Sequence, residues 1–259
     1  MKDKPLLTVS RLSKRFARGS APVTAVDDVS FHIDPSETLA LAGPSGSGKS
    51  TIARLLLRLI EADAGSIRFG GEDFLALKGQ ALRRRRKKLQ LVFQDPLAAF
   101  NPRATVARAI EDPLRIHAVV PRRDRADRVT TLLERVGLDP GLRGRAIHEV
   151  SGGQRQRVAI ARALATKPSL IVLDEALSAL DVSVRRRILD LLLDLQHEEK
   201  IAYLFISHDL AVVRAIAHRV LILDHGRIAE QGNARAVIDA PRSDIGRALV
   251  GAVPKLRHT

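Results

Sequence analysis

The stretch Gly43-Pro-Ser-Gly-Ser-Gly-Lys-Ser-Thr51 decides the fold of this chain. It follows an aliphatic run at residues 38–42, which predicts a short strand, and it precedes apolar residues at helical spacing. Glycines let a backbone turn sharply and approach a ligand closely, and the N–H groups at the start of a helix attract an anion. Because G-x-x-x-x-G-K-[ST] stands here between a strand and a helix, it predicts a nucleoside triphosphate site. The apolar positions that define the helix are Ile52, Leu55, Leu56, Leu59 and Ile60.

Two residues of this loop have predicted roles of their own. Lys49 is expected to contact the β- and γ-phosphates of ATP, and the hydroxyl of Ser50 is expected to bind Mg²⁺. The other nucleotide-binding candidates in the loop are Gly43, Pro44, Ser45, Gly46, Ser47, Gly48 and Thr51.

A second stretch, Leu170-Ile-Val-Leu-Asp-Glu175, places two carboxylates at the end of a continuous apolar run. Such a run is typical of a strand buried on both faces. Strand ends line the nucleotide crevice of α/β sheets, so Asp174 is predicted to bind Mg²⁺. Glu175 is predicted to act as the general base for the attacking water. A salt bridge at the strand end is the structural alternative.

Short apolar runs alternate with longer helical patterns, which predicts a mainly parallel sheet with helices packed on it. Residues 184–195 repeat the helical apolar spacing, whereas strand signals vanish between Gln94 and Thr166. The sequence therefore predicts one domain with an α/β core (1–94 and 167–240), a helical insert (95–166) and a short tail (241–259). The predicted strands lie at 6–9, 29–33, 38–42, 66–69, 170–173, 202–206 and 220–223.

Composition bounds the function further. The chain has 259 residues, a formal net charge of +14, 45% hydrophobic residues and only 3% aromatic residues, so a base-stacking nucleic-acid surface is disfavoured. It has no Cys, which excludes disulfides and thiolate metal sites. No apolar run is long enough to cross a bilayer, and the first ten residues lack an apolar signal core, so an intracellular protein is expected. The run Arg83-Arg-Arg-Arg-Lys-Lys88 suits nucleic acid or anionic lipid, although a solvated helix face is favoured.

The stretch Val150-Ser-Gly-Gly-Gln-Arg-Gln-Arg157 begins a second helical pattern, with Ser151 as a good N-cap. It resembles the signature motif of ABC-transporter ATPases. That resemblance implies that Ser151, Gly152, Gly153 and Gln154 contact the γ-phosphate of ATP bound to the opposite subunit. An ordinary capped helix is the alternative.

The resemblance extends over residues 6–254 and implies roles for four more residues. Phe16 looks like the aromatic that stacks on adenine, with a core Phe as the competing interpretation. Gln94 resembles the glutamine that touches Mg²⁺ and water, and Asp181 belongs to a Ser-Ala-Leu-Asp turn similar to the loop that crosses the dimer interface. His208, after a predicted strand, resembles the switch histidine at the γ-phosphate. The corresponding alternatives are a solvated Gln, a plain capping turn and a histidine without a functional role.

The fold implied by the resemblance is a P-loop NTPase (RecA-like) core with a small N-terminal antiparallel β region and an inserted α-helical subdomain. Residues 94–106, 111–114 and 174–184 are similar to the peptide/nickel importer group. Many ABC ATPases have Pro after the Asp-Glu pair, whereas that group has Ala, and this chain has Ala176 at the position. Val150 stands where Leu is usual, and the tail segment 241–249 departs from the His-Pro-Tyr-Thr-Arg-Ala-Leu stretch of that group.

The implied function is ATP hydrolysis, dependent on ATP and Mg²⁺, that energises uptake of peptides, nickel or a related solute. The implied partners are a second ATPase chain, two membrane permease subunits and an extracytoplasmic binding protein, with this chain on the cytoplasmic face of the membrane. An ABC exporter ATPase, an ABC-type ATPase acting on DNA or ribosomes, and a non-hydrolysing nucleotide binder are the alternatives. The sequence leaves two questions open: which cargo is transported, and whether the two ATPase chains form a homodimer or a heterodimer.

Overall fold

The computed structural model describes residues 4–18 and 21–252. Its internal contacts divide the chain into two compact units. Unit 1 consists of Met1–Gly79 and Ala202–Thr259, and unit 2 consists of Gln80–Ile201. The helical insert predicted for residues 95–166 falls inside unit 2, which also contains two strands and two further helices.

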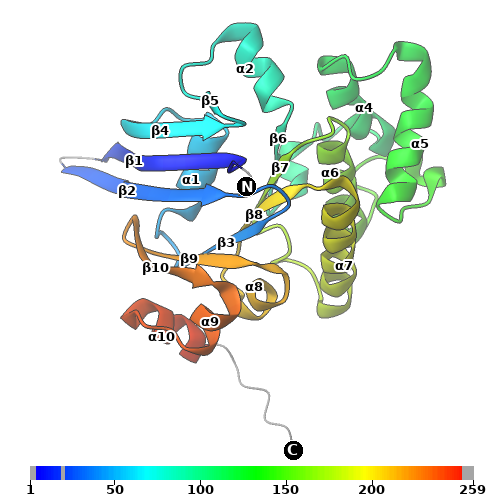
Figure 1. The fold of residues 1–259 in the computed structure, drawn as a ribbon. Helices are drawn as coiled ribbons and strands as arrows, with labels where there is room; N and C mark the ends of the chain where they lie inside the picture. Colours follow the sequence, from blue (N-terminus) through cyan, green and yellow to red (C-terminus); the bar gives the residue numbers. More distant parts are fainter. Residues whose placement is uncertain (1–3, 19–20, 253–259) are drawn as a thin grey trace, which may run out of the picture. The chain divides into compact units, whose positions relative to one another are not determined.

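Unit 1 contains an antiparallel sheet with the strand order β2-β1-β4-β5, which confirms the expected antiparallel β region (Figure 1). Its longest pairing joins β1 (Leu7–Arg18) to β2 (Ala21–Ile33), and β4 (Ala64–Phe69) lies on the other side of β1. The two-residue strand β5 (Glu72–Asp73) closes the sheet. Both long strands extend well beyond the predicted runs at 6–9 and 29–33, because the pairing continues through mixed polar and apolar residues, among them the buried Leu12 and Val26.

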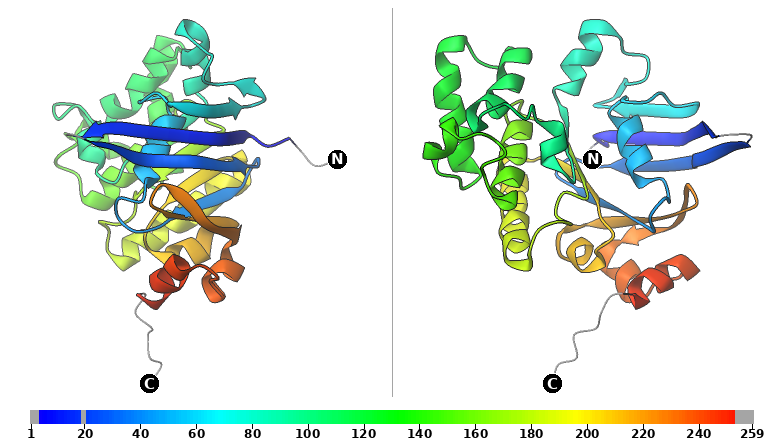
Figure 2. Two further views of the ribbon diagram at one scale, coloured as in Figure 1. Left: turned by 90° about the vertical axis from the view of Figure 1, so that its left-hand side faces the viewer. Right: turned by 180° about the vertical axis from the view of Figure 1, so that it is seen from behind.

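The second group of strands in unit 1 carries the predicted phosphate loop. β3 (Thr38–Ala42) lies between β8 (Ala202–Ile206) and β9 (Arg219–Asp224) and is parallel to both. All residues of β3 and β8 are buried, as their continuous apolar runs predict. β10 (Arg227–Asn233) pairs antiparallel with β9 and alternates between half-buried and exposed residues. The helices of unit 1 are α1 (Lys49–Leu56), α8 (Leu210–Ile216), α9 (Ala234–Asp239) and α10 (Asp244–Gly251), which Figure 2 shows from two further sides.

Helix α1 is shorter than its apolar spacing predicts. It ends at Leu56, and Arg58 takes a positive φ of 51°. The guanidinium of Arg58 donates hydrogen bonds to the carbonyls of Phe74 (3.2 Å) and Leu77 (2.6 Å). Leu59, one of the apolar positions from which the helix was predicted, is 56% exposed. These side-chain bonds favour a turn where the periodicity alone favours one more helical turn.

Unit 2 contains one parallel pair of strands, β6 (Leu89–Val92) and β7 (Leu170–Asp174). Residues 95–166 form no strand, and their only β contact is an isolated bridge between Thr105 and Ala146. The helices are α2 (Gly79–Arg86), α3 (Pro96–Ala99), α4 (Val106–Ile116), α5 (Arg125–Arg135), α6 (Gly152–Leu164) and α7 (Val182–Glu199), with 3₁₀ turns η1 (Arg122–Asp124) and η2 (Pro140–Gly144).

The helices of unit 2 meet through aliphatic faces. In α4, Val106, Ile110 and Leu114 are fully buried, at the spacing of successive helical turns. Each such side chain contributes about 1.5–3 kcal/mol on burial. None of the helices in the described part of the chain combines the length and the apolar character that crossing a bilayer requires.

Candidate functional site

The predicted phosphate loop joins β3 to α1 in unit 1. Gly43 and Gly48 have φ values of 148° and 107°, in the region that favours glycine. A Cβ on Gly43 would lie 2.4 Å from the carbonyl oxygen of Leu223, and one on Gly48 would lie 2.3 Å from that of Ala25. Both positions therefore require glycine for conformation and for space.

Lys49 is buried at the start of α1, with 6% of its surface exposed. Its Nζ donates hydrogen bonds to the carbonyls of Gly43 (2.9 Å) and Pro44 (2.8 Å), so the ammonium group lies inside the loop. Ser47 is also buried, and its carbonyl accepts a hydrogen bond from the Gly226 N–H at 3.0 Å. Gly226 was not among the predicted residues. The sequence carries no signal for its role, because it contacts the loop from far along the chain.

His208 lies at the same end of the unit 1 sheet as this loop. β3 and β8 are parallel neighbours, with Leu41 opposite Ile206, so their carboxyl ends meet at one edge. The Ser207 N–H donates to the carbonyl of Leu41 at 3.3 Å, and His208 follows as an exposed residue. Asp209 then caps α8 by accepting from the N–H groups of Ala211 and Val212. Unit 1 therefore brings the predicted switch histidine to the strand edge that carries the phosphate loop.

Unit 2 places Gln94 and the two carboxylates together in the same way. β6 and β7 are parallel, with Val92 opposite Leu173. Gln94 follows the carboxyl end of β6 as an exposed residue. Asp174 ends β7, and Glu175 comes next, both half-buried. The three side chains predicted to handle Mg²⁺ and water therefore share one edge of this strand pair.

Glu175 adopts a left-handed backbone conformation with φ 48°. For a residue with a Cβ, this conformation costs roughly 1–2 kcal/mol. The turn is held by Ser178, whose N–H and Oγ donate to the Glu175 carbonyl at 3.1 and 2.9 Å. Other non-glycine residues of the described chain share a positive φ, among them Arg58, so the catalytic role of Glu175 stays a prediction.

The predicted signature stretch forms the start of α6. Ser151 is the N-cap, and its Oγ accepts from the Gln154 N–H at 3.2 Å, while the Gln154 side chain accepts from the Ser151 N–H at 3.0 Å. This reciprocal pair is a capping box. Ser151 and Gly152 are exposed, whereas Gly153 and Gln154 are half-buried. The exposed hydroxyl and the first N–H groups of the helix can accept an anion from outside the chain.

Asp181 is the N-cap of α7. Its carboxylate accepts from the Val184 N–H (2.9 Å) and from the Ser183 hydroxyl (2.8 Å). These two hydrogen bonds, the first above all, lower the pKa of Asp181 below its ordinary value. The capping turn that was the alternative for this residue is present. The role at a dimer interface stays a prediction.

Phe16 lies on β1 and is 39% exposed, so it is not a core residue. The Nζ of Lys14 is 5.6 Å from the centroid of its ring. An exposed ring face next to a cation can accept an adenine, and this contact stays a prediction.

The residues predicted to bind Mg²⁺ offer the ligands that this ion prefers. The Ser50 hydroxyl, the Gln94 amide and the Asp174 carboxylate supply oxygen atoms only. Across residues 4–18 and 21–252 there is no cluster of three or more His, Cys, Asp or Glu that could hold a metal ion. Mg²⁺ is ordinarily bound through one or two carboxylates together with phosphates and water, and oxygen groups of the kind that Ser50, Gln94 and Asp174 carry suit that coordination.

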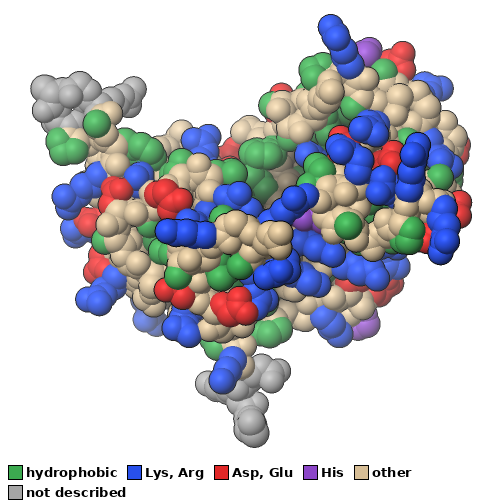
Figure 3. Space-filling model, turned by 90° about the horizontal axis from the view of Figure 1, so that it is seen from above, with side chains coloured by type: hydrophobic (Ala, Val, Ile, Leu, Met, Phe, Trp, Pro, Cys, Tyr) green, Lys and Arg blue, Asp and Glu red, His purple; other side chains and the backbone are tan. Residues whose placement is uncertain are grey.

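The basic run 83–88 forms the end of α2 and the segment after it. Arg83 donates to the carbonyl of Ile116, and Lys88 Nζ donates to that of Lys167 at 3.0 Å. Burial lowers the pKa of His117, and the nearby charges of Arg83 and Lys87 lower it further. Figure 3 shows Lys and Arg side chains spread over the viewed face with Asp and Glu among them. Part of the run thus has intramolecular roles, and only Arg83 and Arg84 of the run are exposed, so the predicted solvated helix face stays a prediction.

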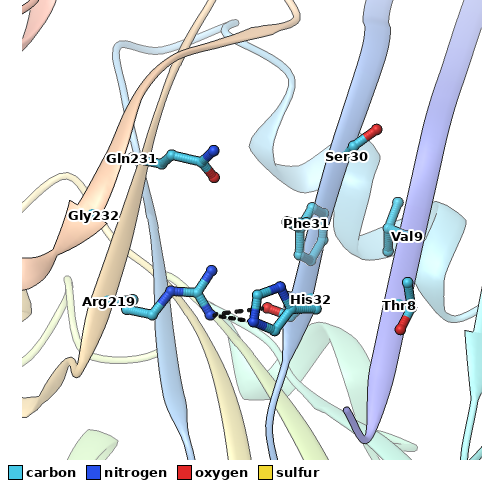
Figure 4. A pocket seen from close by; sticks show the side chains of 8 residues that line it. All are labelled: Thr8, Val9, Ser30, Phe31, His32, Arg219, Gln231 and Gly232. Atoms are coloured by element: carbon cyan, nitrogen blue, oxygen red, sulfur yellow. Dashed lines mark hydrogen bonds between the residues drawn. The ribbon is translucent and has the colours of Figure 1, made fainter. Parts of the chain in front are cut away.

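A separate cavity in unit 1, about 480 Å³ in volume, lies among β1, β2, β9 and β10 (Figure 4). Arg219 points across it and donates to the ring of His32 at 3.2 Å and to the carboxylate of Glu37 at 2.9 Å. None of the predicted site residues lines this cavity. We therefore assign it no part in the candidate site.

Comparison with known families identifies a match. A model described as "ABC transporter" matches residues 26–178, which is more than half of the chain. The matched range includes the phosphate loop, Gln94, the signature stretch and Glu175.

Comparison with characterised proteins and with solved structures agrees with the family match. The chain is 50% identical over 258 residues to the glutathione import ATP-binding protein GsiA of Escherichia coli (strain K12) and of Shigella sonnei, covering 97% of this chain. It spans 41% of the length of those relatives. Among structures, it is similar to cbiO1 from Clostridium perfringens, part of the ABC transporter complex cbiONQ (TM-score 0.79, 28% identity, 92% of each chain). It is also similar to the ATP-binding cassette MJ0796 bound to ADP and Pi (TM-score 0.79, 27% identity, 88% of this chain and 99% of that one). These likenesses confirm the predicted P-loop NTPase fold.

Proposed function

Because this chain belongs to the ABC transporter family, we propose that it hydrolyses ATP to energise an importer of peptides or a related small solute. One observation carries the nucleotide part of this proposal. The Lys49 ammonium is buried inside a glycine-rich loop and is held there by two backbone carbonyls. The loop leads into the N-terminus of a helix, where backbone N–H groups attract anions. A cation enclosed by such a loop is suited to binding phosphate groups.

In this proposal the loop residues bind the triphosphate and Lys49 neutralises charge on the β- and γ-phosphates. Mg²⁺, held by Ser50, Gln94 and Asp174, supplies further charge neutralisation on the phosphates when bound. Glu175 accepts a proton from the attacking water, and His208 donates a hydrogen bond to the γ-phosphate. Phe16 stacks on the adenine ring.

Two cassettes complete each site. Ser151, Gly152, Gly153 and Gln154 of one chain bind the γ-phosphate held by the other, and Asp181 lies at the interface between the chains. The solved cassette MJ0796, similar over 99% of its length, is described as dimeric, which supports this arrangement. The subgroup resemblance favours a second, different ATPase chain as the partner.

The remaining partners follow from the importer assignment. We propose two transmembrane permease subunits and an extracytoplasmic solute-binding protein, with this chain bound at the cytoplasmic face of the membrane through the permeases. The relatives named for import favour uptake over export, and nothing in the site favours an ATPase acting on DNA or ribosomes.

The cargo is best described by chemistry. The relatives are named for import of glutathione, which is a short peptide, and the identity to them is 50% over nearly the whole chain. This favours a peptide-like solute over a nickel ion. Because cargo meets the binding protein and the permeases, the ATPase chain would discriminate cargo only through them.

Reconstitution tests the proposal. The chain, its partner ATPase and candidate permeases are placed in vesicles, and ATP hydrolysis is measured with binding proteins loaded with glutathione, dipeptides or Ni²⁺. Stimulation by a peptide-loaded binding protein is expected. Stimulation only by the Ni²⁺-loaded protein would reverse the cargo assignment, and absence of hydrolysis in every combination would overturn the ATPase assignment.

Replacement of one residue tests the shared site. Ser151→Ala should leave ATP binding to the Lys49 loop unchanged and stop hydrolysis, because Ser151 serves the other chain's nucleotide. Equal loss of binding and hydrolysis would argue against a site shared between chains.

A further inference from the structure

The two glycines at the start of α6 have different surroundings. A Cβ on Gly153 would lie 2.6 Å from the Cγ1 of Val184 on α7, and 3.7 Å from its Cγ2. Carbon atoms in contact are ordinarily about 3.5–4.0 Å apart. The backbone of α6 therefore approaches Val184 so closely that a side chain at position 153 would require Val184 or the start of α6 to shift.

Gly152 has no such neighbour. Among the described residues, apart from its chain neighbours and the adjacent backbone of its own helix, no heavy atom lies within 4 Å of a Cβ placed on it. Neither glycine has a positive φ, so the backbone at both positions is compatible with alanine. The space requirement at Gly153 comes from within this chain, whereas any such requirement at Gly152 must come from a molecule outside it.

Two arginines lie one turn further along the two helices. Arg157 follows Gly153 by one turn of α6, and Arg187 follows Val184 by one turn of α7. Burial lowers the pKa of Arg157, and the charge of Arg187 lowers it further. Both arginines line a cavity of about 390 Å³ that Ser151, Gly153 and Val184 also line. The close approach of Gly153 and Val184 joins the start of α6 to α7 beside this cavity.

Val184 is also fixed at its other side. Its N–H donates to the Asp181 carboxylate at 2.9 Å. One residue thus contacts the signature start through its side chain and the N-cap of α7 through its backbone.

We propose that Val184 is a positioning residue: its side chain sets where the backbone of Ser151–Gln154 lies, and Gly153 is required as the space that this side chain occupies. The consequence for hydrolysis rests on the proposed function, because it assumes that this backbone binds a γ-phosphate. The packing of Val184 against Gly153 does not depend on the proposed function.

A reciprocal pair of substitutions tests the proposal. Gly153→Ala should slow ATP turnover by about tenfold or more, because overpacking displaces the helix start. Affinity for MgATP at the Lys49 loop should stay within about twofold, since that loop belongs to unit 1. Adding Val184→Ala removes both γ carbons and should return turnover to the rate of Val184→Ala alone.

Two matched controls make the result specific. Val182 is on the same helix and 80% exposed, so adding Val182→Ala to Gly153→Ala should not restore ATP turnover. Gly152→Ala should slow turnover and should not be restored by Val184→Ala. The proposal is overturned if Gly153→Ala leaves ATP turnover unchanged, or if adding Val184→Ala does not restore the turnover of Gly153→Ala. It is also overturned if turnover recovers equally in either control pair.

Thermal unfolding separates this proposal from the proposed function. Gly153→Ala should lower the unfolding midpoint of the full chain by about 3 °C or more, and the double variant should regain it. If the wild type does not hydrolyse ATP, the proposed function fails while this measurement still decides the packing. An unchanged midpoint in Gly153→Ala would overturn the packing whatever the ATPase result.

Discussion

The Nζ of Lys49 lies 2.8 Å from the carbonyl oxygen of Pro44, within the phosphate loop to which both residues belong. A second bond, to the carbonyl of Gly43, places the ammonium group 2.9 Å from the first residue of the loop. The lysine side chain is therefore held in the loop by two backbone carbonyls. This preorganisation lowers the entropy lost on binding a ligand, because the long side chain is already ordered.

Lys49→Ala should weaken MgATP binding by about 10- to 100-fold, since hydrogen bonds to charged groups contribute about 1.5–3 kcal/mol. Fluorescence titration with a labelled ATP analogue measures this. Lys78→Ala is the matched control, because Lys78 is an exposed lysine of the same unit. Comparable weakening in both variants would mean that general positive charge, not the loop lysine, binds the nucleotide.

Glu175→Gln should reduce hydrolysis by about 10²- to 10⁴-fold while ATP binding stays intact, because the amide cannot accept the proton of the attacking water. Single-turnover hydrolysis and equilibrium binding, measured on the same preparation, separate the two effects. Unchanged hydrolysis would remove Glu175 from the role of general base.

The central strands could be predicted from the sequence because they are buried on both faces. The runs at 38–42 and 202–206 have the same bounds in β3 and β8, where continuous burial demands continuous apolar residues. The capped start of α6 was equally predictable, since Ser151 and Gln154 occupy the positions of a capping box. The motif residues could also be assigned to strand ends and helix starts, although their roles in chemistry stay predictions.

Features set by tertiary contacts left no local signal. The turn at Arg58 depends on carbonyls of Phe74 and Leu77, which lie well beyond it in the chain. The need for glycine at position 153 depends on Val184, 31 residues later by number (184 − 153 = 31). Strand β10 was missed because its alternating polar residues lack a continuous apolar run. Sequence periodicity describes one element at a time, and these features arise between elements.

The backbone at Glu175 provides a prediction about stability. Asn tolerates the left-handed conformation better than Gln, which has the same amide on a longer side chain. At φ 48°, Glu175→Asn should therefore be more stable than Glu175→Gln by about 0.5–1 kcal/mol. Urea unfolding of the two variants measures the difference, and both should lack hydrolysis. A less stable Asn variant would mean that this backbone carries no relievable strain.

Asp181 should make the stability of the chain depend on pH in the acidic range. Hydrogen bonds from the Val184 N–H and the Ser183 hydroxyl lower its pKa in the folded state. A carboxyl whose folded pKa is depressed stabilises the fold above its unfolded pKa, near 3.8, and this contribution is lost as pH falls through the folded pKa. The stability advantage of the wild type over Asp181→Asn should thus be full at pH 6 and shrink below about pH 4.

Asp194→Asn provides the control for this experiment, since Asp194 is an exposed carboxylate on the same helix. Thermal unfolding between pH 6 and pH 3 compares the three proteins. An Asp181→Asn difference that is constant over this range would contradict a depressed pKa at Asp181.

The ion pair between Arg219 and Glu37 should contribute more to stability than an exposed pair in the same unit. The two side chains meet at 2.9 Å, and Glu37 is only 8% exposed, so its charge has little access to water. Arg219→Met leaves a buried carboxylate without its cation and should cost about 2–4 kcal/mol in unfolding free energy. Adding Glu37→Gln should recover part of this cost, because the uncompensated charge is then removed. Arg214→Met, which breaks the exposed pair with Asp239, should cost less than about 1 kcal/mol. Equal costs for the two arginine substitutions in urea unfolding would show that burial of Glu37 does not determine the strength of its pair.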